Sequence, residues 1–456
     1  MNVSENIMGT QPLPKLLFKM AVPAVIANLV NSLYNIVDQI FIGQGIGYLG
    51  NAATSIAFPL TAVCLAFGLM FGLGGAANFN LALGRKDNEK ASRVAGTAVT
   101  MVLIFGLSAC VITNIFLKPL LIMFGATDNI LDYSMEYTKI ISFGIPFLMF
   151  SIGINPLVRA DGSPTYSMFA VVSGAVLNTL LDPIFIFVFN LGIKGAAIAT
   201  LISQILSALI LALYFKHFKS VRLSVRDFLP SFDTIFCIIS VGISSFIFQF
   251  SNMIIQIVTN NMLRKYGAVS VYGSDIPIAV AGIVMKISMI FTAIIIGIVQ
   301  GAQPIIGYNY GAEKYDRVKN TVKLMLSAAF IISLAAFACF EIFPLALISL
   351  FGEGSELYFD FGVKYMRVFL FFTILNGLQI SSTTFFQAIG KAGKGAVLSL
   401  TKQVVFLLPL LIILPKFMGV TGVMYAGPSA DFIAFCTAFT LLVLELRSMP
   451  KNSETV

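Results

Sequence analysis

Long apolar segments alternate with short polar segments along almost the whole chain. Twelve of the apolar segments reach the roughly 20 residues that a helix needs to cross a lipid bilayer. The connecting segments are rich in glycine, proline, aspartate and asparagine, as in ADGSPT and FGEGSE. The pattern predicts membrane-spanning helices at residues 16–43, 52–83, 94–117, 137–157, 164–189, 193–215, 234–262, 276–306, 320–343, 362–387, 395–415 and 420–445.

The composition supports an all-α integral membrane protein. Of the 456 residues 58% are hydrophobic and only 11% are charged, and the mean hydropathy is +0.92. A soluble domain carries about 25% charged residues to cover its water-facing surface. The opening residues MNVSENIMGTQPLPK lack the basic start and the cleavage site of a signal peptide, so we expect the first span to remain in the mature protein.

The basic residues indicate how the chain is oriented in the membrane. With the N-terminus in the cytoplasm, most of the 29 lysines and arginines, Arg159 and Lys402 among them, fall on the cytoplasmic side, and only Lys286 falls inside a span. This bias predicts a multi-pass protein of the plasma membrane with both termini in the cytoplasm. The net charge of +8 then faces anionic lipid headgroups. Because the charges are scattered over many loops, we expect membrane lipids as partners and no nucleic acid.

The two halves of the chain repeat each other. The segment GLGGAANFNLALGRKDNEKASRV from Gly72 recurs as GIVQGAQPIIGYNYGAEKYDRV from Gly297. VRADG at 158 matches FQAIG at 386, and LGIKGAA at 191 matches MGVTGVM at 418. The repeat predicts two six-helix bundles related by a pseudo-twofold axis around a central cleft, with a substrate site where they meet. The expected divisions are an N-terminal lobe at 1–215, a basic cytoplasmic linker at 216–231 and a C-terminal lobe at 232–456.

A polar stripe interrupts the first apolar span. Asn28, Asn31, Asn35 and Asp38 are spaced i, i+3, i+7 and i+10, which places them within an arc of roughly 80° on a helix. An ionisable side chain facing lipid is costly, so this stripe is expected to face the protein interior or a water-filled cavity. As an alternative, Asp38 could bond the neighbouring asparagines as a packing device.

A second acidic position lies in the fifth span, within NTLLDP. Asn178 and Asp182 are four residues apart and share a helix face. Pro183 follows and removes a donor from the helical ladder near the carboxylate. Two carboxylates in a pocket of low dielectric repel each other, so at least one tends to hold a proton or share a hard cation. Asn178 could instead be a structural link between helices.

Three segments, PAVIANLVNSLYNIVDQIFIG, GAQPIIGYNYGAEK and LNTLLDP, resemble signatures of the multidrug and toxic compound extrusion (MATE) family, in particular its MepA-type bacterial branch. The likeness extends from about residue 14 to 445. The resemblance implies an antiporter that exchanges inward-moving H⁺ or Na⁺ for an outgoing organic, often cationic compound. It also implies a cation pocket in the N-terminal half formed by Asp38, Asn178 and Asp182, with Thr200 of the sixth span. Thr200 could instead bond its own helix backbone.

Several side chains are candidates for the substrate cavity. Methionine and aromatic side chains suit binding of varied molecules because they repack around different shapes, although in a membrane bundle they more often serve packing. The candidates are Asn31, Tyr34, Asn35, Tyr137, Met149, Asn155 and Met168 in the first half and Gln249, Asn252 and Gln256 in the second. Pro23 is expected to kink the first span.

The second half keeps the polar stripe but has lost the acids. Gln249, Asn252 and Gln256 follow Asn28, Asn31 and Asn35 by 221 residues, and the position matching Asp38 is Thr259. Leu408 stands where the first half has Asp182. We therefore expect ion coupling to be confined to the N-terminal half. Some family members carry acids in the seventh and tenth spans, so their absence here leaves a second cation site in doubt.

The remaining intramembrane charges are Lys286 and Asp431. They could pair with each other, because an unpaired charge at that depth is costly, or they could act in substrate release or gating. Glu341 lies near the outer end of the ninth span and should reach water. The five cysteines have no close spacing, and the single histidine, His217, lies in a loop. These residues predict neither disulfides nor a metal site, and no cofactor is expected.

Other function classes fit less well. A lipid-linked oligosaccharide flippase of the same superfamily is the alternative, but it would line its cleft with several arginines or lysines. An intramembrane prenyl-transferring enzyme needs clustered aspartates for Mg²⁺, and NTLLDP has only one. No glycine-rich ATP loop is present, so an ion gradient must drive transport. A channel would not need the carboxylate pocket. We expect a monomeric transporter of small organic cations and not an enzyme.

Overall fold

The computed structural model describes residues 7–126, 128–273, 275–351 and 355–450, and the elements assigned within them are all helical. The first half contains α1 (Ile7–Thr10), α2 (Leu13–Ile46), α3 (Tyr48–Gly84), α4 (Asn88–Ile115), α5 (Leu117–Met123), α6 (Asp128–Ala160), α7 (Pro164–Pro183), η1 (Ile184–Val188) and α8 (Ile193–Tyr214). The second half contains α9 (Phe232–Gly267), α10 (Asp275–Gly311), α11 (Tyr315–Ile342), α12 (Pro344–Ser349), α13 (Glu356–Phe369), α14 (Thr373–Ala388), α15 (Ala392–Leu400), η4 (Thr401–Leu407), α16 (Leu408–Met418) and α17 (Val420–Ser448).

The helix lengths confirm the predicted membrane fold. Within the described residues, 11 helices are long and apolar enough to cross a membrane, or 12 when α13 and α14 count as one span. These two helices meet at an angle of 47°. The bend falls inside the span predicted at 362–387, and no proline or glycine marks it between Phe369 and Thr373.

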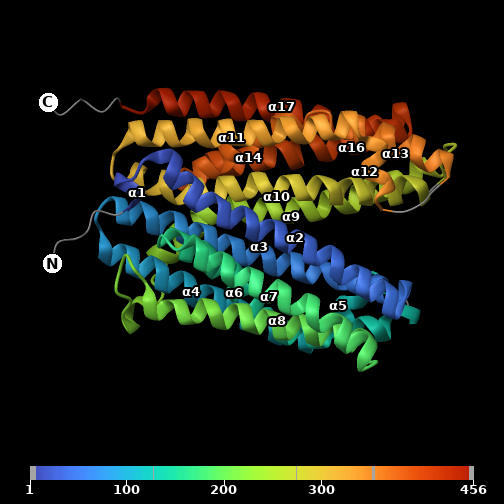
Figure 1. Ribbon diagram of the computed structural model, residues 1–456, viewed down its shortest axis with the longest axis horizontal. Coiled ribbons are helices and arrows are strands. Elements are labelled where there is room, and N and C mark those ends of the chain that lie inside the picture. The colour runs from blue at the N-terminus through green and yellow to red at the C-terminus, as the bar shows by residue number, and fades with distance from the viewer. Residues whose placement is uncertain (1–6, 127, 274, 352–354, 451–456) are drawn as a thin grey trace.

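The helices form two lobes, one from each half of the chain (Figure 1). Residues with positive φ recur at matching positions in both lobes: Gly47 with Gly273, Lys86 with Glu313, Gly162 with Gly390 and Gly192 with Gly419. Positive φ is unfavourable for residues other than glycine, so Lys86 and Glu313 reflect a backbone geometry that both repeats share and not a local accident. The duplication seen in the sequence therefore extends to the turns between helices.

The lobes meet along a pseudo-twofold axis that passes between Gly84 and Gly311. These two residues occupy matching positions in the repeat, and each packs against the backbone of the other lobe: Gly84 against Tyr308 and Gly311 against Leu81. Leu81 and Tyr308 also match each other in the repeat. Reciprocal contacts of this kind are what a twofold axis produces.

A GxxxG motif brings α2 and α10 into close contact. A Cβ atom on Gly297 or on Gly301 would lie 2.5 Å from the Cα atom of Val25 or of Ala21, respectively. Small residues in this spacing let membrane helices approach closely. The matching crossing joins α3 to α9, where Gly74 packs against the backbone of Gly242.

The first turns of α2 and α9 each pack into the opposite lobe. Leu16 and Met20 of α2 belong to the same apolar cluster as Val322 and Phe385 of the C-terminal lobe. The short helix α1 is held there too, because its Met8 carbonyl accepts a 2.9 Å hydrogen bond from the amide of Asn309. Reciprocally, Ile238 and its neighbours on α9 join the core of the N-terminal lobe. α2 therefore links the two lobes mechanically.

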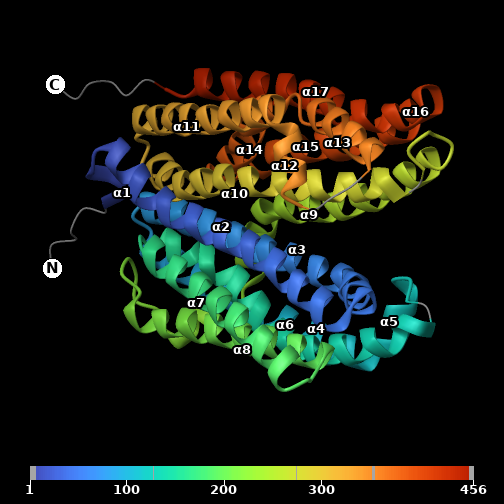
Figure 2. The same cartoon turned by 45° about the vertical axis from the view of Figure 1, so that its right-hand side comes forward.

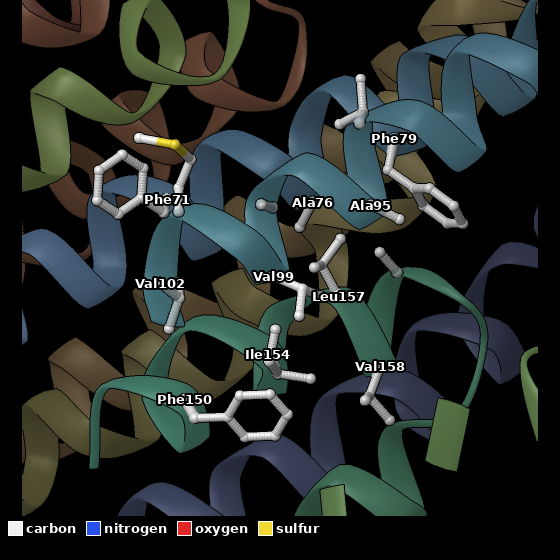
Figure 3. Close-up of a cluster of buried hydrophobic side chains, with 14 of the residues drawn as sticks. Phe71, Ala76, Phe79, Ala95, Val99, Val102, Phe150, Ile154, Leu157 and Val158 are labelled. Atoms are coloured by element: carbon white, nitrogen blue, oxygen red, sulfur yellow. The ribbon is translucent and has the colours of Figure 1, made fainter. Parts of the chain in front are cut away.

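The core of the N-terminal lobe lies between α3, α4 and α6. Figure 3 shows Phe71, Val99, Val102, Ile154 and Leu157 from these helices pointing toward one another. The linker at 216–231 is docked on this lobe and not suspended between the two. The Asp161 carboxylate accepts hydrogen bonds from the Tyr214 hydroxyl (2.7 Å) and from the backbone N–H groups of Lys219 (2.7 Å) and Ser220 (2.8 Å).

The close contacts between the lobes gather toward one end of the molecule. We call this end, where the first turns of α2 and the last turns of α17 lie, the terminal side. Among the described glycines, those packed across the interface, such as Gly74, Gly84 and Gly301, lie on this side. Figure 2 shows the helices of the two lobes drawing apart toward the other end. The structure is therefore closed at the terminal side.

Candidate functional site

Two acidic side chains from different helices meet inside the N-terminal lobe. Asp38 of α2 and Asp182 of α7 place their carboxyl groups next to each other, close enough to interact electrostatically. The Asp182 residue is fully buried, and Asn178, one turn earlier on α7, is 2% exposed. Helical spacing brings both residues of NTLLDP onto the face that meets α2.

Asn178 connects the acidic pair to α8. Its amide nitrogen donates a 3.2 Å hydrogen bond to Asp182 Oδ1 and lies 3.4 Å from Thr200 Oγ1. The second distance corresponds to a weak hydrogen bond. The structure thus brings together all four residues expected in the cation pocket, with Thr200 as the most loosely held member.

Three oxygen atoms in this cluster have no protein donor. Asp38 Oδ1, Asp182 Oδ2 and Asn178 Oδ1 are buried and accept no hydrogen bond from the described residues. An ionised carboxylate can only accept hydrogen bonds, and an unsatisfied buried polar group costs about 1–3 kcal/mol. The arrangement is complete when one carboxyl is protonated or when a cation lies between the oxygens.

The local backbone next to Asp182 is irregular. Pro183 has no N–H group, and the π-helical segment η1 follows it directly. Single π-helical turns inside α-helices are frequent at functional sites. Because α7 and η1 together form one candidate membrane span, this irregularity interrupts a span beside the acidic pair.

Two tyrosines flank the acids. The phenol groups of Tyr34 on α2 and Tyr137 on α6 interact electrostatically with both Asp38 and Asp182. Asn35 follows Tyr34 but is exposed, and its amide donates a 2.6 Å hydrogen bond to the Asn31 carbonyl. Tyrosine hydroxyls can donate to a carboxylate, so both rings are placed to respond to the charge of the pair.

A cavity of about 220 Å³ lies beside the acidic pair, between α2, α6, α7 and α8. Its polar lining includes Asn28, Asn31, Tyr34, Asn155, Asn178 and Thr200. The C-terminal lobe contributes Gln300, whose side-chain oxygen accepts a 3.1 Å hydrogen bond from the Asn28 amide. Side chains from both lobes therefore line the cavity. Asn178 and Thr200 belong both to this lining and to the cluster that surrounds the two acids.

Arg159 also lines this cavity, and sequence reasoning missed it. The residue is 7% exposed, and its guanidinium donates a hydrogen bond to Asn155, which in turn accepts one from the Ser167 hydroxyl (2.7 Å). No carboxylate pairs with it among the residues that the structure describes. The sequence repeat could have drawn attention to this residue, because VRADG has an arginine at the position where FQAIG has Gln387.

Some predicted cavity residues lie elsewhere. The prediction that Met149 lines the cavity is wrong: it is 1% exposed and packs in the apolar core of the lobe, which periodicity cannot distinguish from a cavity wall. Met168 is half-buried on α7 and is not part of the lining. Gln249, Asn252 and Gln256 lie on α9 in the other lobe, outside this cavity. Pro23 is buried within α2, which continues through it as one helix.

The predicted pairing of Lys286 with Asp431 is also wrong. Asp431 Oδ1 instead lies 2.8 Å from the ammonium nitrogen of Lys402. The sequence places Lys402 at the cytoplasmic boundary, but this residue stands seven residues inside the predicted span 395–415, and η4 carries it into the C-terminal lobe. Lys286 is half-buried on α10 and forms no ion pair within the described ranges.

All five cysteines are free, and no group of three or more metal-ligating side chains occurs among the described residues. Glu341 is partly exposed and lies 3.8 Å from Arg367. Thr259 is buried on α9, and Leu408 begins α16.

Comparison with known proteins identifies the family. A model of the MatE family matches residues 23–184 and 243–413, which is more than half of the chain. Multidrug export protein MepA of Staphylococcus haemolyticus (strain JCSC1435) is 28% identical over 439 residues, covering 95% of this chain and 94% of the relative. Multidrug export protein MepA of Staphylococcus aureus (strain NCTC 8325 / PS 47) is 27% identical over 436 residues, with 95% and 94% covered.

Solved structures show the same fold. The outward-facing conformation of a multidrug resistance MATE family transporter of the MOP superfamily superposes with a TM-score of 0.91 at 24% identity, covering 98% of this chain and 99% of that one. A MATE structure in the bent conformation gives 0.88 at 25% identity, with 96% of each chain covered. The family model, the relatives and the fold all agree with the resemblance to the MATE family. They indicate a multi-pass membrane transporter and not an enzyme. The chain belongs to the MatE family of membrane transporters.

Proposed function

We propose that this protein is an antiporter of the plasma membrane that couples the inward movement of H⁺ or Na⁺ to the export of organic, often cationic compounds. The relatives named as multidrug export proteins support the export function. The contact between Asp38 and Asp182, with its donorless buried oxygens, is the observation that supports ion coupling in the N-terminal lobe. The oxygen ligands suit either ion.

The chemistry of the pair supplies a driving force. Two unit charges about 4 Å apart interact by about 4 kcal/mol at an effective dielectric of about 20. A proton or a sodium ion between Asp38 and Asp182 removes this repulsion, and its departure restores it. The energy difference is large enough to shift an equilibrium between two conformations.

α2 can convey this change to the second lobe. Asp38 stands in the half of α2 that meets α7, whereas Met20 and its neighbours are embedded in the core of the C-terminal lobe. A shift of α2 relative to α7 therefore acts on the contact between lobes. This is a physical route from ion occupancy to alternating access.

The orientation follows from the basic residues. With both termini in the cytoplasm, the terminal side is the cytoplasmic side, and the glycine contacts close the protein there. Transport requires a second state in which these contacts open and the outer halves of the lobes close. The protein is proposed to act as a monomer, with no cofactor other than its coupling ion.

The cavity favours organic cations over lipid-linked phosphates. A flippase for lipid-linked oligosaccharides would need several free basic groups, and Arg159 is the single basic residue in the lining. Lys402 is neutralised by Asp431. The acidic pair beside the cavity attracts positive charge.

The test replaces Asp38 by asparagine, which preserves its size and removes its charge. Asp38→Asn should abolish drug efflux from cells while the protein is still made and inserted. Asp233→Asn is the matched control, because Asp233 is an exposed aspartate in the first turn of α9. Undiminished efflux by Asp38→Asn would remove Asp38 from the mechanism.

A further inference from the structure

The C-terminal lobe contains a partly buried ionic cluster formed by three separate helical segments. Lys402 of η4 places its ammonium 2.8 Å from Asp431 Oδ1 of α17 and 2.7 Å from Asn376 Oδ1 of α14. The Asn376 amide closes the group by donating a 3.3 Å hydrogen bond to Asp431 Oδ2. The ammonium therefore lies between a carboxylate oxygen and an amide oxygen.

This cluster is shielded from solvent. The side chains of Lys402 and Asp431 are 18% and 11% exposed. Taking two charges out of water costs several kcal/mol per ion, and a buried ion pair is often no more stabilising than apolar residues of the same volume. Stability alone is therefore a weak reason for a lysine and an aspartate inside an apolar lobe, where intramembrane charges usually serve function.

The other lobe holds a comparable centre with a different occupancy. There, Asp182 stands beside the π-helical segment η1 of the fifth span. An asparagine donates to it, and no basic side chain in the described part of the chain forms an ion pair with it. The eleventh span, its counterpart in the repeat, also contains a π-helical segment, η4, which carries Lys402. The buried oxygens of the N-terminal lobe are thus free to bind a mobile ion, whereas those of the C-terminal lobe contact the ammonium group of Lys402.

We propose that Asp431 and Asn376 form a monovalent-cation site and that Lys402 fills it as a tethered cation. The oxygens of this site are those that would ligate Na⁺, K⁺ or a small alkylammonium ion if the lysine were absent. Lys402 makes the C-terminal lobe independent of external cations, so that a change of ion occupancy is left to the N-terminal lobe. Cation binding to Asp431 does not depend on the proposed antiport, and only its effect on coupling rests on that function.

The direct test uses Lys402→Met, which keeps the unbranched apolar stem of the side chain and removes its ammonium group. It is made in an Asp38→Asn background to exclude cation effects from the N-terminal lobe. Thermal unfolding of the purified protein is measured with choline, Na⁺, K⁺ or methylammonium as the cation. We expect Lys402→Met to unfold several degrees lower in choline and to recover in a saturable way with at least one of the small cations. Lys323→Met, at an exposed lysine of α11, should show no such dependence.

The double variant Lys402→Met/Asp431→Asn decides whether the recovery belongs to this site. It should lose the cation dependence, because the carboxylate that attracts the ion is gone. Equal stability of Lys402→Met in choline and in the small cations would overturn the proposal. The same holds if the double variant recovers as fully as the single one, or if Lys402→Met fails to fold in every cation tested.

A separate measurement examines the transport consequence. With Asp38 intact, Lys402→Met should move more coupling ions per exported drug molecule than the wild type in proteoliposomes, because a second site can be occupied. An unchanged ratio in a protein that has gained Asp431-dependent binding would contradict the role in coupling but not the site. If the wild type showed no ion-coupled drug transport in this assay, that result would instead contradict the proposed antiport.

Discussion

Asp38 on α2 and Asp182 on α7 hold their carboxyl groups in contact, although they come from the first and fifth spans of the chain. Neither Asp38 Oδ1 nor Asp182 Oδ2 has a donor among the described side chains. Such a pair is stable only when a proton or cation neutralises part of its charge. The proposed coupling of ion movement to export depends on this contact.

Asp182→Asn should raise the thermal stability of the protein at neutral pH and low Na⁺ while abolishing ion-driven transport. The substitution removes the repulsion between the two carboxylates and gives Asp38 an amide donor. Thermal unfolding and efflux measured on the same preparation check both effects. A variant that is destabilised yet still coupled would show that the two acids do not compete for an ion.

Asn178→Ala and Thr200→Val should differ in their effects. Asn178 donates to Asp182 at 3.2 Å, whereas its contact with Thr200 is 3.4 Å long. A hydrogen bond to a charged group is worth about 1.5–3 kcal/mol and stabilises the ionised, ion-free carboxylate, so Asn178→Ala should change apparent ion affinity about 10-fold or more, towards tighter binding if the ion is a proton. Thr200→Val should change it about 3-fold or less. The concentration of coupling ion giving half-maximal transport is the measurement, and the reverse order would make Thr200 the principal ligand.

Gly301→Ala should prevent full closure of the terminal side. A Cβ atom there would lie 2.5 Å from the Cα atom of Ala21, and the backbones of α2 and α10 would have to separate. Gly282→Ala is a control on the same helix, because a Cβ atom at Gly282 meets nothing within 4 Å. Spin labels on the two lobes at the terminal side should report a longer distance for Gly301→Ala only. Equal distances in the two variants would mean that the GxxxG contact does not control closure.

The same helix pair predicts where the outer gate closes. Gly301 packs on Ala21 and Gly297 packs on Val25. Positions nearer the N-terminus of α10 therefore face positions nearer the C-terminus of α2. Continuing this antiparallel register places Lys286 opposite Ile36, close to Asp38. Cysteines at positions 36 and 286, in a protein without its native cysteines, should therefore cross-link only when the outer halves close. Cross-linking that is equally fast in the cytoplasmically closed state would contradict this gating geometry.

The sequence is informative where a chemical pattern coincides with a helix face. The spacing of Asn28, Asn31 and Asp38, and of Asn178 and Asp182, is enough to indicate which side chains share a surface, because helical periodicity is a local property. The repeat predicts two similar lobes. The structure adds that the first turns of α2 pack in the core of the C-terminal lobe and the first turns of α9 in the core of the N-terminal lobe.

Features set by tertiary packing cannot be predicted in this way. Helix periodicity does not separate a core methionine such as Met149 from one that lines a cavity. The partner of Asp431 depends on η4, whose wider turns change the direction in which Lys402 points relative to a regular helix. The sequence places Arg159 at the membrane boundary, whereas its buried position follows from contacts with Asn155. Each of these depends on a contact between side chains or on a local departure from α-helical geometry.

The central claim is that ion occupancy at Asp38 and Asp182 drives export. The most direct test is uphill drug transport in proteoliposomes, with a pH gradient and a sodium gradient imposed separately on the wild type and on Asp38→Asn. One of the two gradients should drive accumulation by the wild type, and neither should drive it in the variant. Uphill transport by Asp38→Asn at the wild-type rate would contradict the claim.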